Sequence, residues 1–192
     1  MDQLIVSETH RFNESNRTII YQDGSIKPYD NIDTKIEVYE ARVKEWFLDV
    51  AKNLVGYGIS RGDYAAVMIT LSFIEGIEKF KCGNEIGGSR FIFKKSAAKI
   101  FPGVNQKIIS RLYDETRCGL FHSGFPDGKI YLSHDRNLPI YTEDKRIFIN
   151  PLKFTEKIIQ YFDNYITELK NPFNENSREK FEFLWDKLWN KS

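Results

Sequence analysis

The stretch Asp63-Tyr-Ala-Ala-Val-Met-Ile-Thr-Leu-Ser-Phe-Ile74 is apolar on nearly every side of a helix, and acidic residues return only at Glu75 and Glu78. A helix with so little polar surface belongs in the middle of a fold, since each of its faces needs an apolar neighbour. Asp63 is a candidate N-cap for it. We therefore predict a central helix over residues 63–80.

Further helices are predicted on both sides of this stretch. From Asp33, apolar side chains repeat at helical spacing as far as the glycines at 56 and 58. A second stripe follows Pro151, a residue that suits a first helical turn. A last stripe follows residue 172 and ends in Trp185 and Trp189. This terminal helix is expected to pack on its own domain, and docking on a partner is the alternative.

Two segments favour β structure. Arg17–Tyr21, followed by the turn residues at 23 and 24, indicates a strand within residues 1–32. Lys129–Ser133 and Arg146–Ile149 indicate a β-hairpin or a two-stranded ribbon. The fold class expected is therefore mainly α, a helical bundle with one small β-hairpin. It divides into an N-terminal irregular or β segment (1–32), a helical domain (33–170) and a C-terminal amphipathic helix (171–192).

The charge of the chain is unevenly distributed although its formal total is only +1. Residues 79–117 hold nine Lys or Arg against three Asp or Glu, a local excess of +6. Such an excess can attract a polyanion, and a solvated face balanced elsewhere is the alternative. The candidate RNA-binding residues are Lys94, Lys95, Lys99, Lys107 and Arg111. The nearby aromatics Phe91, Phe93 and Phe101 are expected in the core, with stacking on bases as the alternative.

Other sequence features bear on the cellular compartment, on membrane spans and on metal binding. The two cysteines, together with an opening Met-Asp-Gln-Leu that lacks a basic apolar leader, favour a reduced, cytoplasmic chain. No apolar run reaches the roughly 20 residues of a membrane span. Cys118 and His122 are four residues apart, but no second paired ligand motif accompanies them, so neither a metal nor another cofactor is expected.

The stretch Tyr113-Asp-Glu-Thr-Arg117-Cys-Gly-Leu-Phe-His122-Ser carries the candidate chemistry. A guanidinium is a permanent planar cation suited to phosphate oxygens, and imidazole exchanges protons near neutral pH. On a regular helix five residues leave the two side chains roughly 140° apart and about 7.5 Å apart along the axis. The alternative for His122 is a structural role, in which it stabilises the end of its helix through the helix dipole.

The spacing Tyr113-x3-Arg117-x4-His122-x-Gly124 at a helix end resembles the motif of HEPN domains, in which Arg-x(4 to 6)-His lies on a late helix of an α-helical bundle. The resemblance covers roughly residues 33–170, and its specific part is 113–124. It implies a HEPN-like bundle that acts as a homodimer, with Arg117 and His122 as the catalytic pair of a metal-independent endoribonuclease. Toxin–antitoxin and phage-defence systems use such enzymes, which implies an antitoxin or regulatory protein as a further partner.

Cleavage of this kind would use the RNA 2'-hydroxyl as nucleophile and leave a 2',3'-cyclic phosphate, so DNA would be resistant. Cys118 and Gly119 form a small-residue patch that favours close approach of a second copy, and they are the candidate dimer contacts. Catalytic HEPN members usually have a polar residue directly after the arginine, where this chain has Cys118. The alternative is therefore a HEPN-like dimer that binds nucleic acid, nucleotide or a partner protein without cleaving it.

Overall fold

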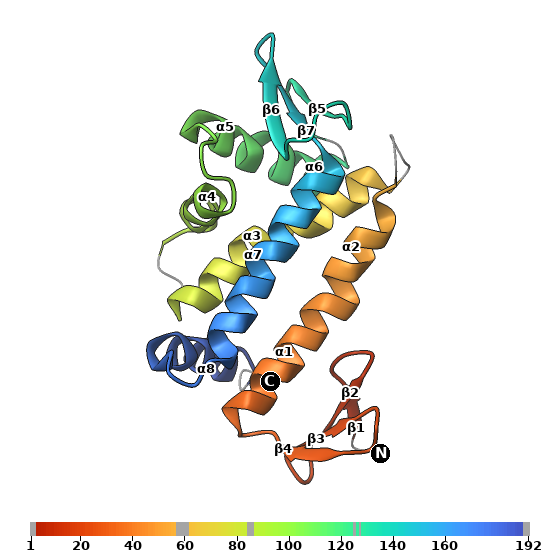
Figure 1. Cartoon of the computed structure of the whole chain (residues 1–192), viewed down its shortest axis with the longest axis vertical. Coiled ribbons are helices and arrows are strands. Elements are labelled where there is room, and N and C mark those ends of the chain that lie inside the picture. The colour runs from red at the N-terminus through yellow and green to blue at the C-terminus, as the bar shows by residue number, and fades with distance from the viewer. Residues whose placement is uncertain (1–2, 57–61, 84–86, 125, 127, 190–192) are drawn as a thin grey trace.

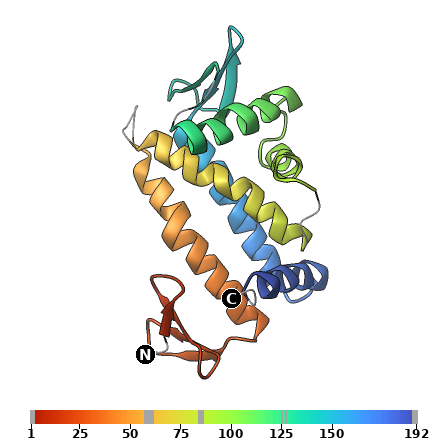
Figure 2. The same cartoon turned by 180° about the vertical axis from the view of Figure 1, so that it is seen from behind.

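The computed structural model describes residues 3–56, 62–83, 87–124, 126 and 128–189 (Figure 1). About 61% of the chain is helical, and two small sheets accompany the helices. The fold is therefore α+β, and the expected mainly α bundle with a single hairpin is wrong. The two sheets lie at opposite ends of the helical body, as both views show (Figures 1 and 2).

Three long helical rods form the body of the molecule. The first consists of α1 (Ile32–Val43), the π-helical turn η1 (Lys44–Leu48) and α2 (Asp49–Leu54). The others are α3 (Asp63–Cys82) and α7 (Pro151–Lys170), which lie side by side (Figure 2). The core side chains of α3 are fully buried, as expected for a central helix; they include Val67, Leu71, Ile74 and Ile77.

The starts and ends of these helices follow local chemistry. Asn31 is the N-cap of α1, and its side chain accepts hydrogen bonds from the backbone N–H groups of Asp33 and Thr34. The predicted stop at Gly56 and Gly58 falls close to the end of α2 at Leu54, although residues 57–61 lie outside the described part.

A second helical layer covers one side of α3. It begins with α4 (Ser89–Ile100), a regular helix that carries part of the basic segment. The stretch that carries the Arg117 and His122 motif consists of α5 (Gln106–Arg111), the π-helical turn η2 (Leu112–Arg117) and α6 (Cys118–Ser123). A π turn is wider than an α turn and is often found at functional sites. This π turn ends at Arg117, and the residues that follow as far as His122 belong to the regular helix α6.

The N-terminal segment is an antiparallel sheet of four short strands in the order β1-β2-β3-β4. The strands are β1 (Gln3–Ile5), β2 (His10–Asn13), β3 (Thr18–Tyr21) and β4 (Ile26–Pro28). Phe12 and Ile19 bury one face of the sheet in the common core. Only β3 was visible in the sequence, because strands of three or four residues are too short to show a clear alternation.

The second sheet has the order β5-β7-β6, with β5 (Ile130–Leu132), β6 (Ile140–Glu143) and β7 (Arg146–Ile149). The predicted hairpin between 129–133 and 146–149 is wrong, since β5 and β7 pair in parallel. The true hairpin joins β6 to β7 through Asp144 and Lys145, whose φ angles are 47° and 63°. Two positive φ angles are typical of a type I′ turn, but neither residue is the glycine that would reveal it in a sequence.

The terminal helix α8 (Glu175–Trp189) crosses one end of α3, where Phe181, Leu184 and Trp185 are buried. Its apolar stripe therefore faces the chain's own core. Among the described helices, none combines the length and the apolar character needed to cross a bilayer.

Candidate functional site

Arg117 closes the π-helical turn η2 and directs its guanidinium toward α3. Nη2 lies 3.6 Å from Glu75 Oε2, and the guanidinium carbon lies over the rings of Tyr113 (5.4 Å) and Phe121 (5.3 Å). The side chain remains 28% exposed. Two ring contacts and one carboxylate thus hold the cation in a defined direction without enclosing it.

Glu75 is not dependent on Arg117 for its charge balance. Lys79 Nζ lies 2.8 Å from its carboxylate, and the Ser89 hydroxyl donates a hydrogen bond to it. Burial on its own raises the pKa of Glu75, but these hydrogen bonds and the neighbouring cations hold the pKa below its ordinary value. A separation of 3.6 Å is too long for a good hydrogen bond, so the guanidinium of Arg117 keeps donors for another acceptor.

His122 occupies the last turn of α6, which ends at Gly124 with a φ of +79°. Its side chain is exposed, and the described part of the chain gives it neither a hydrogen bond nor an ion pair. No described contact joins His122 to Arg117 either. A single copy therefore presents a guanidinium oriented by three neighbours and an exposed imidazole, with no hydrogen bond or ion pair between them among the described residues.

The two predicted dimer contacts lie mostly inside the single chain. Gly119 is buried, and Cys118 is half-buried with a free thiol. The exposed apolar surface beside the motif is provided by Phe121, which is 47% exposed. If two copies meet at this helix, Phe121 and His122 have more surface to offer than Gly119.

The five predicted RNA-binding residues fall into two groups. Lys95 and Lys99 converge on the buried carboxylate of Glu78, at 3.1 and 2.7 Å, and Arg111 pairs with Glu115. Lys94 and Lys107 have no ion pair among the described residues. The apparent excess of +6 is thus partly balanced by carboxylates of α3 that precede the basic segment in sequence.

The three aromatic residues of the basic segment also separate. Phe93 and Phe101 are buried, in agreement with the core expectation. Phe91 is 59% exposed, so the same expectation is wrong for it. Phe93 lies on the side of α4 that faces the core, whereas Phe91 lies near the exposed first turn of this helix. The sequence did not reveal this difference.

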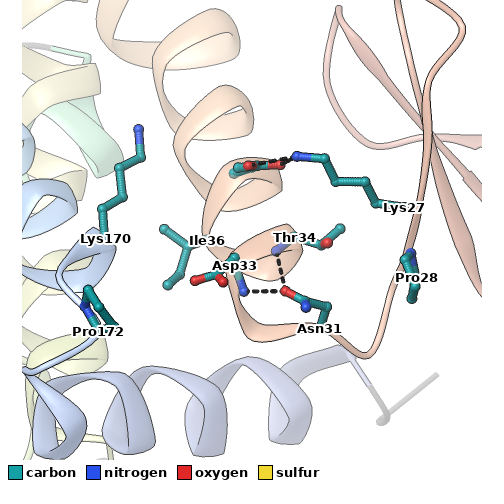
Figure 3. Close-up of a pocket in the computed structure, with 9 residues that line it drawn as sticks. Lys27, Pro28, Asn31, Asp33, Thr34, Ile36, Lys170 and Pro172 are labelled. Atoms are coloured by element: carbon teal, nitrogen blue, oxygen red, sulfur yellow. Dashed lines mark hydrogen bonds and ion pairs between the residues drawn. The ribbon is translucent and has the colours of Figure 1, made fainter.

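Other polar clusters are structural. A hollow of about 550 Å³ lies between β4, the start of α1 and the end of α7 (Figure 3). Its Lys27 is bound to Glu37 and its Asn31 caps α1, so both are occupied. His134 Nε2 lies 2.8 Å from the buried Asp63 carboxylate. The described residues contain no group of three or more His, Cys, Asp or Glu placed to hold a metal ion.

Searches of protein-family models, curated proteins and solved structures find no match to this chain. Its candidate chemistry therefore has to be argued from its own residues.

Proposed function

We propose that this chain is a metal-independent endoribonuclease of the HEPN type, acting in the cytoplasm as a homodimer. The observation that carries the proposal is the environment of Arg117. Its guanidinium is directed by two aromatic rings, is partly exposed, and shares Glu75 with Lys79 and Ser89. An exposed imidazole follows five residues later at His122.

The physical argument is one of preorganisation. A cation held in place before the substrate arrives costs little reorganisation when negative charge develops on a phosphate. Arg117 meets this condition because Tyr113 and Phe121 fix its plane while its contact with Glu75 is long. The placement of η2 at the motif fits the same interpretation, since π turns are often associated with functional sites.

The reaction follows from these groups. The 2'-oxygen attacks the adjacent phosphorus, the bond from phosphorus to the 5'-oxygen breaks, and the proton lost by the 2'-hydroxyl is returned to the 5'-oxygen. His122 transfers the proton, an effect worth about 10²- to 10⁴-fold in rate. Arg117 binds the nonbridging oxygens. The resemblance to HEPN domains implies that two copies form the site together.

A second candidate is an RNA-binding dimer of the same type that does not cleave. The contact between Arg117 and Glu75 favours it, because a guanidinium whose purpose is to neutralise a buried carboxylate is structural. Cys118 directly after the arginine favours it as well, on the resemblance to HEPN motifs. Such a dimer would bind RNA and release it unchanged.

The experiment compares wild type with Arg117→Ala and His122→Ala on single-stranded RNA, in excess chelator and across about pH 6 to 8. Arg136→Ala is a matched control, because Arg136 also lies over an aromatic ring and pairs with a glutamate. We expect cleavage by wild type and the control, loss of at least about 100-fold in both motif variants, and 2',3'-cyclic phosphate ends. A pool of the same sequences with deoxyribose should remain intact.

Glu75→Gln separates the two candidates. If Arg117 serves the reaction, this variant retains cleavage, since the two aromatic rings that orient the guanidinium do not depend on the charge of Glu75. Intact RNA with the wild-type protein at every pH contradicts the ribonuclease proposal. Binding without cleavage then supports the second candidate.

A further inference from the structure

A hollow of about 660 Å³ runs along the exposed side of α4 and reaches the start of α5. Its floor is apolar, with Phe91 and Ala98, and its rim is basic. The residues that line it are Gly88, Arg90, Phe91, Lys94, Lys95, Ala98 and Gln106. We refer to this surface as the α4 groove. It has no role in the catalytic pair described above.

Phe91 is the central feature of the α4 groove. Its side chain is 59% exposed, so more than half of it is in contact with water. Gly87 lies close to it, since an added Cβ there would lie only 2.9 Å from the Cδ1 atom of Phe91. Gly87 also has a φ of +90°, a conformation that favours glycine. A side chain at position 87 would therefore crowd Phe91, and the glycine leaves its aromatic surface open.

Positive charge surrounds this open ring. Lys94 has no ion pair among the described residues, and Lys95 is 45% exposed although it contacts Glu78. Arg90 is 53% exposed and pairs with Asp114. The first turn of α4 adds to this, because its N-cap Gly88 provides no side-chain cap for the free N–H groups. An aromatic platform among cations is complementary to a base with phosphates on either side.

The α4 groove is connected to the motif through its first turn. Ser89 donates to Glu75, the carboxylate that also faces Arg117. Arg90 pairs with Asp114, three residues before Arg117 on the same π turn. The groove and η2 are thus linked by two side-chain contacts.

We infer that the α4 groove binds single-stranded RNA, with one base stacked on Phe91 and the flanking phosphates held by Lys94, Lys95 and Arg90. The inference deepens the proposed function and depends on it for the choice of RNA as the nucleic acid. Stacking tolerates any base, so the groove is expected to bind with little sequence preference. Its affinity is expected to fall steeply with salt.

The test is binding of a fluorescent 2'-O-methyl RNA of about ten nucleotides, measured by anisotropy on the full chain. This probe lacks the nucleophile and cannot be cleaved. Phe91→Ala is expected to raise Kd about 5- to 150-fold, whereas Phe91→Trp retains binding. Phe173→Ala is the matched control, because Phe173 is 90% exposed on the far turn before α8. Lys94→Ala is compared with Lys157→Ala in the same way.

The outcomes distinguish the groove from the catalytic proposal. Equal affinity of Phe91→Ala and wild type overturns the groove, while the cleavage assay with His122→Ala still decides the ribonuclease. Loss of binding in Phe91→Ala without any cleavage by wild type supports the groove and contradicts the ribonuclease. Absence of binding by wild type at about 50 mM salt overturns the groove as an RNA site. Unchanged circular dichroism of Phe91→Ala excludes unfolding as the cause of weaker binding.

Discussion

The indole Nε1 of Trp185 donates a hydrogen bond of 2.8 Å to the hydroxyl of Tyr29, and both side chains are buried. The two residues are 156 positions apart in the sequence. Their contact joins the terminal helix α8 to the segment between the N-terminal sheet and α1. The two ends of the chain therefore share one core, in which the ring of Trp189 also lies 5.5 Å from that of Tyr29.

We expect Trp185→Phe to lower the free energy of unfolding by about 1–3 kcal/mol, because the buried hydroxyl of Tyr29 loses its partner. Tyr29→Phe should have a similar effect. The double variant should cost less than the sum of the two, since both substitutions remove the same hydrogen bond. Denaturant unfolding measures all three. Fully additive costs would show that this hydrogen bond contributes nothing.

We expect Glu78 to make the stability of the fold depend on pH. This residue is 1% exposed, and its carboxylate contacts Lys95 and Lys99. Burial on its own raises the pKa of this carboxyl, but the hydrogen bonds from the two lysines hold it below the ordinary value. Because the pKa is lower in the folded state than in the unfolded state, the ionised carboxylate stabilises the fold above about pH 4.3. This stabilisation is lost as the pH falls through the folded-state pKa.

Glu78→Gln should therefore lower the free energy of unfolding by about 1.5–3 kcal/mol at pH 7. Its difference from wild type should shrink as the pH falls below about 4. Glu156→Gln is the matched control, since Glu156 forms an exposed pair with Lys153 and should cost at most about 1 kcal/mol. A difference that stays constant from neutral to acid pH would contradict the role given to the lysine pairs.

Two glycines with positive φ differ in how much room the structure leaves for an added side chain. Gly83 ends α3 with a φ of +67°, and an added Cβ would lie 2.9 Å from the Cα of Lys180 on α8. Gly103 has a φ of +89° and no atom within 4 Å of the same position. Gly103→Ala should cost about 1–2 kcal/mol from the backbone alone. Gly83→Ala should cost about 1–3 kcal/mol more, since α8 has to shift. Thermal unfolding that ranks the two equally would be evidence against close packing of α8 on the end of α3.

The proposed homodimer can be separated from chain stability with two substitutions in α6. Wild type is expected to sediment as a dimer at low salt and tens of micromolar protein. Phe121→Ser should weaken the dimer without lowering the unfolding temperature, because Phe121 is exposed in one chain. Gly119→Leu should instead destabilise the fold by about 1–3 kcal/mol, because Gly119 is buried. A monomeric wild type under these conditions would contradict the proposal.

The sequence by itself determined the long elements. The apolar run after Asp63 required a central helix, and Pro151 with its stripe required the helix that packs beside it, since both patterns extend over several turns. The Arg117 and His122 pair was also visible, because its evidence is the identity of two residues and their spacing. The short strands β1, β2, β4 and β6 were not visible, and neither was the parallel pairing of β5 with β7, which depends on contacts between segments distant in the chain.

Only the tertiary structure decided which charges are available. Glu75 and Glu78 precede the basic segment in sequence, yet α3 places them against Arg117, Lys95 and Lys99. It also decided that Phe91 faces water while Phe93 faces α3. A sequence fixes the number of charges and rings, but Coulomb attraction and burial depend on distances of a few ångströms between elements, and only folding sets those distances.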